Sequence, residues 1–369
     1  MLDRARNGYT GAQVEAALHA SRRRIRFRYE LYSKSGAFKA HLKNVRGGSV
    51  EYNAGADIKR TAKFEWVDTT EVDYLSDRVK PICRVGVGSG WAEFPLGLFL
   101  LSTTPRTLTE GSRAVMRTVE AYDLAKILVD DRVTTRYTVP AGAEYIAKVR
   151  ELLEGAGITA HNLTPSTKTL PAARDWDPGT SKLEIINDLL RAIVYHDLWF
   201  DENGVAVAAP YISPAEKASE YTYKNDNRSV LLPDAEQLLD LWSVPNKWVL
   251  TVSESDMEVL RSEYTNTNPN SPTSTVSRGR TIVRYETVDA ESQAALDAMV
   301  ERMAFEDSQV YETFQLGTAV MPFHSHMDVL TLEFTDMSIP ATRYEEVFWG
   351  FELKAGSAMK HIVRRIVTV

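Results

Sequence analysis

The sequence contains a single cysteine, Cys83, among 369 residues. One thiol cannot form an intramolecular disulfide, and it excludes zinc and iron–sulfur sites built from several cysteines. We therefore expect the chain to be made and folded in a reducing cytoplasm. Cys83 stands in an apolar, strand-like run, which favours a buried small hydrophobic residue over a nucleophile.

Long apolar runs are also missing. No segment approaches the roughly 18–20 consecutive apolar residues that span a bilayer, so we expect no membrane anchor. The first residues, MLDRARNGYTGAQVEAALHASRRR, lack the apolar core of a secretory signal peptide. The composition is otherwise that of an ordinary globular protein, 44% hydrophobic and 25% charged.

The charge is unevenly distributed. Residues 1–63 carry 14 Lys and Arg against 5 Asp and Glu, whereas the whole chain has a net charge of -7. An acidic chain is not expected to be a dedicated nucleic-acid binder. The basic end instead predicts an acidic partner protein or an acidic neighbouring copy of the chain.

The N-terminal third predicts a β-rich domain over residues 1–125. A short helix with a Thr10–Gln13 capping box comes first, and from Arg23 the hydrophobic period becomes two. Short strand-like runs separated by turn residues then favour a small antiparallel barrel or sandwich. These runs are Ser49–Tyr52, Thr61–Val67, Arg84–Val87, Phe94–Thr103 and Ala114–Tyr122.

Residues 126–225 predict an α+β middle subdomain. One helix follows Pro140–Gly142 and ends near Gly155, and a second begins at the Ser181–Glu184 capping pair. Asn203–Gly204, between two apolar runs, predicts a hairpin turn.

Residues 226–369 return to strands and predict a second β domain. A polar loop, Thr265–Arg278, is followed by a helix near 289–305 with Asp289 as its cap and Leu296, Met299, Val300 and Met303 on one stripe. Three strands are predicted at the end: Val329–Phe334, Val347–Leu353 and His361–Val369. A faint echo between residues 97–124 and 347–369 raises the possibility of a duplicated barrel. The predicted fold class is thus α+β and β-rich.

Few motifs in the sequence indicate a catalytic or ligand-binding site. Gly86–Gly90 lacks the sixth-position glycine and the following helix of a nucleotide loop, so it predicts a strand connection. Asp175 and Asp177 flank a tryptophan in a sequence typical of a turn, which favours a structural role for them over a catalytic one. His324 and His326, with Asp328, form the one metal-like cluster, since residues two apart on a strand face the same way. A third ligand would have to come from His361 or His196, and the sequence nominates neither.

A row of arginines is the feature with the most physical content. Arg22, Arg24, Arg26 and Arg28 alternate with Ile25, Phe27, Tyr29 and Leu31, which places four guanidiniums on one strand face. Like charges in such a row repel one another unless an anion lies opposite. Two interpretations stay open: a solvated strand edge, or a subunit interface with acidic residues across it.

The order of these segments resembles the baseplate hub, or tail-associated, proteins of tailed bacteriophages, known in phages of actinobacteria as minor tail proteins. The resemblance lies in AGADIKRTAKFEWVD, YLSDRVKPICRVGVGSGWAEFPLGLFLLSTTPR and VEAYDLAKILVDDRVTTRYTVPAGAEYIAKVRELLEGAGI. It continues in LPAARDWDPGTSKLEIINDLLRAIVYHDLWFDENGVAVAAPY and YTNTNPNSPTSTVSRGRTIV. These motifs are structural rather than catalytic.

The resemblance implies a homotrimeric ring at the tail tip of a virion, synthesised in the host cytoplasm. Two similar β-barrels per subunit would give the ring a pseudo-sixfold face that matches the hexameric tail tube. The implied partners are a tube or distal tail protein above and spike or fibre proteins below, with phage DNA passing through without specific binding. It implies no enzyme activity and no cofactor, and any lytic module would belong to another polypeptide. Interface candidates are the Arg22–Arg28 face and, in the polar loop, Asn268 and Arg278.

Two alternatives remain from the sequence. A metal-dependent cell-wall hydrolase would use His324 and His326. A carbohydrate-binding tail-tip module would use some of the 7 Trp and 16 Tyr, although their strand-alternating positions favour core packing.

Overall fold

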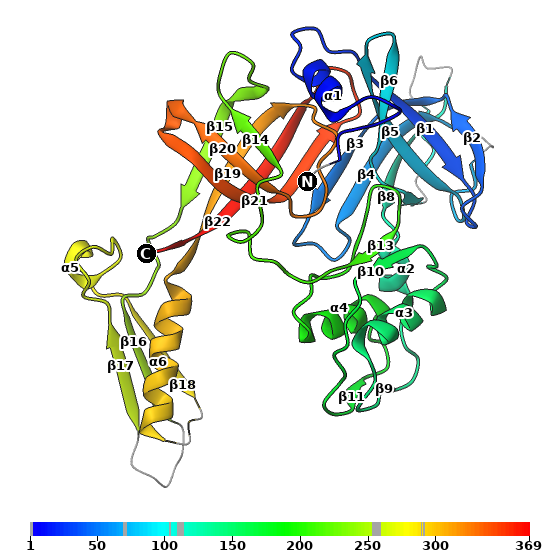
Figure 1. Ribbon diagram of the computed structural model, residues 1–369. Coiled ribbons are helices and arrows are strands. Elements are labelled where there is room, and N and C mark those ends of the chain that lie inside the picture. Colours follow the sequence, from blue (N-terminus) through cyan, green and yellow to red (C-terminus); the bar gives the residue numbers. More distant parts are fainter. Residues whose placement is uncertain are drawn as a thin grey trace. The chain divides into compact units, whose positions relative to one another are not determined.

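The computed structural model describes residues 3–68, 72–102, 105–108, 114–252, 260–288, 290 and 292–369. The fold is β-rich, and most strand pairs are antiparallel (Figure 1). The chain forms two compact units: one comprises Met1–Asp234 with Leu316–Ile362, and the other comprises Ala235–Gln315 with Val363–Val369. These bounds differ from the three predicted segments, 1–125, 126–225 and 226–369, which stay a prediction.

The N-terminal part of the first unit contains helix α1 (Gly11–Leu18) and eight strands. They are β1 (Ile25–Tyr32), β2 (Phe38–Leu42), β3 (Val45–Asn53), β4 (Arg60–Val67), β5 (Arg78–Val87), β6 (Gly90–Pro95), β7 (Phe99–Leu101) and β8 (Met116–Tyr122). Their order in the sheet is β3-β4-β8-β7-β5-β1-β2, with β6 paired to β5. Ile25, Tyr29 and Leu31 are buried, as the period of two predicts.

The C-terminal strands extend the same sheet. They are β14 (Tyr221–Lys224), β15 (Leu231–Leu239), β19 (Gln309–Ala319), β20 (Val329–Phe334), β21 (Ile339–Glu352) and β22 (Ala358–Thr368). The junction is an antiparallel ladder between β21 and β3, in which Trp349 pairs with Tyr52 and Phe351 with Val50. Strands nearly 300 residues apart in sequence therefore share one sheet. β15, β19 and β22 continue along the chain from the first unit into the second.

The middle segment packs around a core of its own. It contains helices α2 (Ala125–Asp130), α3 (Tyr145–Gly155) and α4 (Lys182–Ala192) and strands β9 (Tyr137–Val139), β10 (His161–Leu163), β11 (Arg174–Trp176), β12 (Trp199–Phe200) and β13 (Ala206–Ala208). The predicted apolar faces of α3 and α4 are buried in this core. The turn at Asn203–Gly204 also forms as predicted, with Gly204 at φ +84°.

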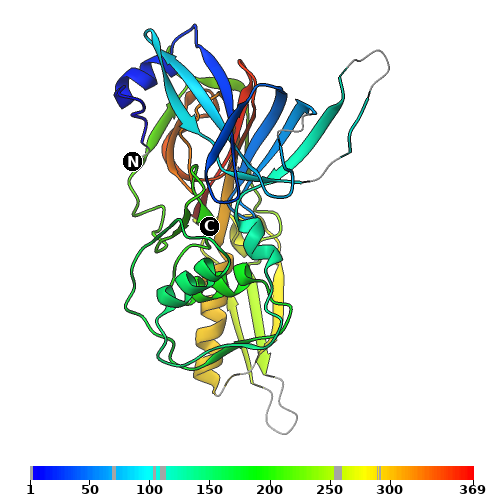
Figure 2. The ribbon, with the colours of Figure 1, turned by 90° about the vertical axis from the view of Figure 1, so that its right-hand side faces the viewer.

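The second unit is a three-stranded sheet with one long helix against it (Figure 2). Besides the ends of β15, β19 and β22, its elements are β16 (Lys247–Val252), β17 (Arg261–Thr265), α5 (Thr275–Arg278), β18 (Val283–Val288) and α6 (Gln293–Asp307). Trp248 and Leu250 of β16 pack against Leu296 and Val300 of α6. The helix covers one face of the sheet, and the opposite face carries the exposed side chains of Val283 and Tyr285.

Several local expectations need correction. The predicted strand Phe94–Thr103 is divided into β6 and β7, because Pro95 and Gly97 interrupt it. A Cβ at residue 97 would lie 2.5 Å from the ring of Phe99, so that ring occupies the space that a side chain would need. Ser292 caps α6, whereas the predicted cap, Asp289, lies outside the described residues. Met299 is exposed, and Ala304 takes the expected place in the core.

Arg60 is a buried cation that connects three parts of the first unit. Its guanidinium donates to the carbonyls of Leu96 (3.1 Å) and Phe200 (3.3 Å) and lies over the rings of Tyr52 and Trp349, 5.5 and 5.1 Å from their centroids. Only 1% of its surface is exposed. The side chain thus joins β4 to β3, to β21 and to the middle segment.

We expect Arg60→Met to destabilise the first unit by about 2–3 kcal/mol, because two carbonyls would lose a charged donor and two rings a cation. Urea unfolding followed by circular dichroism measures the loss. Arg46→Met, at an exposed arginine of β3, is the matched control and should change stability by less than about 0.5 kcal/mol. Equal effects of the two substitutions would contradict the assigned role.

Candidate functional site

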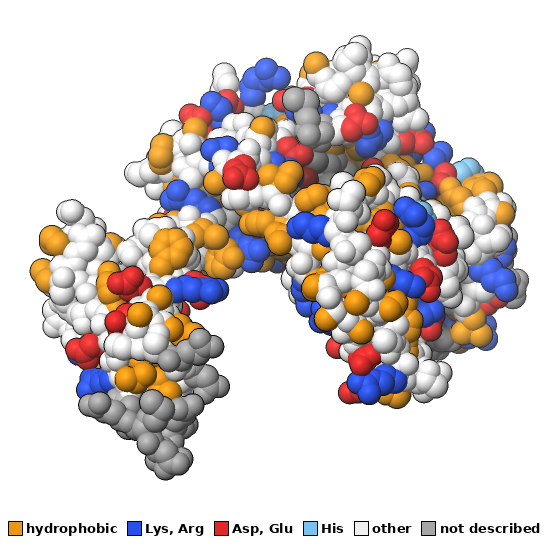
Figure 3. Space-filling view, turned by 60° about the horizontal axis from the view of Figure 1, so that its bottom comes forward, with side chains coloured by type: hydrophobic (Ala, Val, Ile, Leu, Met, Phe, Trp, Pro, Cys, Tyr) orange, Lys and Arg blue, Asp and Glu red, His pale blue; other side chains and the backbone are white. Residues whose placement is uncertain are grey.

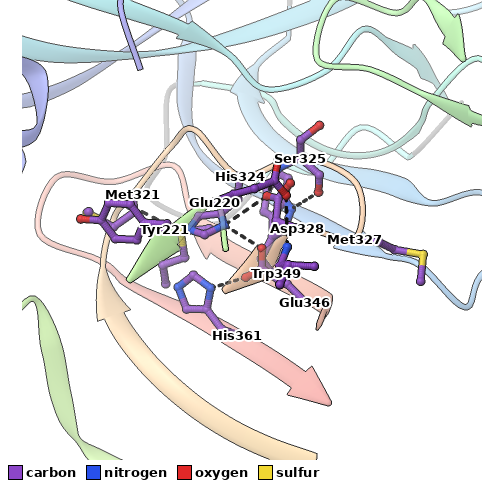
Figure 4. A network of polar contacts seen from close by, with 12 residues as sticks. Glu220, Tyr221, Met321, His324, Ser325, Met327, Asp328, Glu346, Trp349 and His361 are labelled. Carbon is purple, nitrogen blue, oxygen red and sulfur yellow. Dashed lines mark hydrogen bonds and ion pairs between the residues drawn. The ribbon is translucent and has the colours of Figure 1, made fainter. Parts of the chain in front are cut away.

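Three ionisable side chains meet in the core of the first unit. His324 comes from the loop between β19 and β20, Glu346 from β21 and His361 from β22. Figure 4 shows the two imidazoles on either side of the Glu346 carboxylate. His324 Nδ1 lies 2.7 Å from one carboxylate oxygen, and His361 Nδ1 lies 2.5 Å from the other. None of the three side chains has exposed surface.

The outer nitrogens of both rings contact hydroxyl groups. His324 Nε2 lies 2.7 Å from the Tyr223 hydroxyl, and His361 Nε2 lies 2.8 Å from Thr318 Oγ1. Asp328 completes the cluster, with its carboxylate 3.4 Å from His324 Nδ1 and accepting a hydrogen bond from the Ser325 backbone N–H at 2.7 Å. Each ring therefore has a polar neighbour at both of its nitrogens.

Burial and charge act in opposite directions on these groups. Burial disfavours the Glu346 carboxylate, but the two histidines outweigh it and lower the pKa of Glu346 to about 2. Burial also disfavours a charged His324, yet Glu346 and Asp328 raise its pKa to about 9. Burial lowers the pKa of His361 and raises that of Asp328. The two shifts favour the same arrangement, a His324 imidazolium beside a Glu346 carboxylate.

The second predicted histidine, His326, lies in different surroundings. Its ring stacks on Trp199 with centroids 4.1 Å apart, meets the ring of His196 edge-on at 5.2 Å and contacts the Tyr52 hydroxyl. Residues 324–328 form a bend rather than the strand assumed from the spacing, so the two rings have different neighbours. His361 and His196, the two residues considered as further ligands, contact His324 and His326 respectively. Glu346 was missed because its position, 22 residues from His324, has no motif spacing.

The arginine row is balanced largely within the chain. Arg28 contacts Glu30 and Glu93 at 2.9 Å each, and Glu93 also contacts Arg84 at 3.0 Å. The guanidiniums of Arg24, Arg26 and Arg84 all lie about 5 Å from the centroid of one ring, Trp91. The anions and the aromatic ring that offset the row therefore come from β1 and β6.

Three members of the row remain exposed. Arg22 and Arg26 are exposed, as is Arg24, whose guanidinium also donates to the Gly88 carbonyl. Gly86 lies in β5, and Gly88 lies in the turn that joins β5 to β6. The glycine-rich segment is therefore a strand connection, as predicted. A Cβ at residue 86 would lie 2.6 Å from Arg24 Nε, which explains a glycine there.

The predicted polar loop is held by its own hydrogen bonds. Asn268 is exposed, and its side-chain oxygen accepts from the backbone N–H of Asn270 at 3.0 Å. Arg278 instead turns inward to the carbonyls of Val244 (2.8 Å) and Leu241. Asn268 is thus available for contacts outside the chain, whereas Arg278 fixes the base of the loop.

The remaining sequence candidates have structural surroundings. Cys83 is fully buried, and burial raises the pKa of its thiol. Asp175 accepts from Arg136 and Thr138, which ties β11 to β9. Among the described residues, no helix is long and apolar enough to cross a membrane.

No protein-family model matches the chain, and no curated protein matches it in sequence. Solved structures match it in fold. The tail protein from Neisseria meningitidis MC58 aligns with a TM-score of 0.60 at 12% identity, over 92% of this chain and 97% of that one. The 43 kDa tail protein of prophage MuSo2 from Shewanella oneidensis aligns with a TM-score of 0.58 at 9% identity, over 91% and 98%.

The chain has the fold of these tail proteins. The alignments cover more than nine-tenths of every chain compared. The expected phage-tail resemblance is confirmed at the level of fold, while neither match supports an origin in phages of actinobacteria.

We expect Glu346→Gln to destabilise the first unit by about 3–5 kcal/mol, because the buried His324 imidazolium would lose its charged partner. Thermal and urea unfolding measure the effect. Glu352→Gln, at an exposed glutamate on the same strand, is the control and should be nearly neutral. If the Glu346→Gln protein were as stable as this control, an ion pair between His324 and Glu346 would not stabilise the first unit.

Proposed function

We propose that the protein is a structural component of a bacteriophage tail, located at the baseplate hub or tail tip, and a member of the hub family that its sequence resembles. The shared fold with two tail proteins, across nearly the full length of each, is the observation that carries this proposal. Its function would then lie in surfaces that assemble rather than in a reaction.

We further infer a homotrimeric ring. The strands of residues 1–125 and those of residues 226–369 would form two similar barrels, so that three subunits present six related faces to a hexameric tail tube. Repeated heterologous contacts whose rotation closes give such a ring. Spike or fibre proteins would bind on the opposite side, and phage DNA would pass through the centre.

The surface of the second unit supports an assembly role. Ten of the 17 large hydrophobic side chains that are exposed in the described structure lie in this unit, which makes up less than a quarter of the chain. Hydrophobic side chains are visible on this unit in Figure 3. They are Leu238, Trp242, Tyr264, Val276, Val283, Tyr285, Met299, Phe305, Tyr311 and Ile366. Exposed apolar surface of this extent is typical of protein–protein contacts.

The two alternative functions find less support. A hydrolytic metal needs an open coordination position for water and substrate, whereas the side chains of His324, Glu346 and His361 are completely buried. A carbohydrate-binding module would use exposed tryptophan and tyrosine rings, but Trp242 is the one exposed tryptophan of seven, and the exposed tyrosines of the second unit are accounted for by the assembly surface described above. We therefore propose that the protein is not an enzyme.

We expect the purified chain to form a trimer with a central hole. Size exclusion with light scattering gives the mass, and negative-stain images of the same fraction give the symmetry. If the free chain is monomeric, the measurement is repeated with the tail-tube protein present. A monomer or an open, non-threefold assembly under both conditions would contradict the ring.

The exposed arginines test whether the Arg22–Arg28 face forms an interface. The double substitution Arg22→Glu with Arg26→Glu should raise the protein concentration needed for trimer formation at least tenfold. The two new carboxylates would face an acidic partner surface and repel it. Both residues are exposed and neither belongs to the Arg28–Glu93 pairs, so the fold should be kept. Lys43→Glu with Arg150→Glu makes the same charge change at exposed sites elsewhere and should assemble normally. Normal trimers from both proteins would remove this face from the interface.

A further inference from the structure

One close contact within the buried histidine cluster lacks the geometry of a hydrogen bond. His324 Nδ1 and one oxygen of Glu346 lie 2.7 Å apart, but their orientation does not make a hydrogen bond. Neither atom has another hydrogen-bond partner among the described residues, and both are buried. Orphaned polar atoms in a core are costly unless a cation satisfies them.

The second imidazole faces the other oxygen of the same carboxylate. His361 Nδ1 lies 2.5 Å from that oxygen, and His361 Nε2 lies 2.8 Å from Thr318 Oγ1. Nitrogen atoms of two imidazoles therefore approach the two oxygens of one carboxylate.

A positive charge beside His324 Nδ1 and the Glu346 carboxylate can be supplied by a proton or by a metal ion, and the donor set favours a metal. Both Nδ1 atoms face one carboxylate, and Asp328 adds a second carboxylate 3.4 Å from His324 Nδ1. The ligand atoms of His324, Glu346 and His361 all lie within 4.8 Å of one another. These three groups supply two imidazole nitrogens and a carboxylate, which are donor types that zinc binds, and Asp328 would supply the fourth ligand.

The surroundings of the two rings also fit. Metal-bound imidazoles usually donate their outer N–H to a fixed acceptor, and here the Tyr223 and Thr318 hydroxyls lie in those positions. A divalent ion would balance the two carboxylates without leaving net charge in the core. Ligands about 2.0–2.2 Å from zinc lie roughly 3.3 Å apart, so the nitrogen–oxygen contacts would open by less than about 1 Å.

We propose that His324, Asp328, Glu346 and His361 form a closed, structural zinc site. The ion would connect the loop before β20 to β21 and β22, which supply the other two ligands. Because three of the four side chains have no exposed surface and that of Asp328 is only 4% exposed, the ion would enter during folding and exchange slowly afterwards. This site is independent of the assembly role proposed above.

The test unfolds the full chain in guanidinium with a chelator and refolds it with or without one equivalent of zinc. We expect one tightly held zinc per chain after desalting, and a melting temperature roughly 5 °C higher than that of the metal-free protein. Cobalt in place of zinc should give the intense visible absorption of a tetrahedral site. A refolded chain that retains no metal and melts at the same temperature with and without zinc would overturn the proposal.

Variants assign the ligands. His361→Gln and Glu346→Gln should each lower zinc retention at least tenfold, whereas His326→Gln should retain one equivalent, because that ring contacts Trp199 and His196 instead. Loss of zinc in His326→Gln with retention in His361→Gln would contradict the assigned ligand set. If a ligand variant fails to fold, the cobalt spectrum and metal content of the unmodified chain still decide whether the site exists.

Discussion

The antiparallel ladder between β3 and β21 is the constraint on which the first unit depends. It pairs residues 49–53 with 348–352, so the two ends of the chain complete one sheet. Closing so long a loop costs conformational entropy, which local contacts in either half cannot offset. Large aromatic surfaces at the junction provide the compensation, with Tyr52 stacked on Trp349 at 5.7 Å and both rings fully buried.

Buried charge is concentrated around this same junction. Arg60 lies over the Tyr52 and Trp349 rings, and Glu346, three residues before Trp349, lies between His324 and His361. Each buried charge costs desolvation free energy and is tolerated only where partners are held in place. The ladder supplies that rigidity, because β21 carries both Trp349 and Glu346. The charges in turn make the pairing specific, since a slipped register would leave them without partners.

The surface has a different character from this core. The arginine row of β1 is offset by Glu30, Glu93 and Trp91, so its cost to the isolated chain is smaller than the sequence suggests. The second unit exposes many apolar side chains, among them Val283 and Tyr285 on the sheet face opposite α6. A stable core beside uncovered apolar surface is the arrangement expected of a subunit that completes its burial in an assembly.

The sequence by itself determined the local elements of this protein. The Thr10–Gln13 capping box, the apolar faces of α3 and α4, the turn at Asn203–Gly204 and the strand Val329–Phe334 were predictable, because short-range periodicity and capping depend on neighbouring residues. The order of these elements also carried the resemblance to tail proteins. Only the tertiary structure decided which distant residues meet. Glu346 joined His324 and His361, and Glu93 joined the arginine row, because strand pairing places residues together without regard to their separation in sequence.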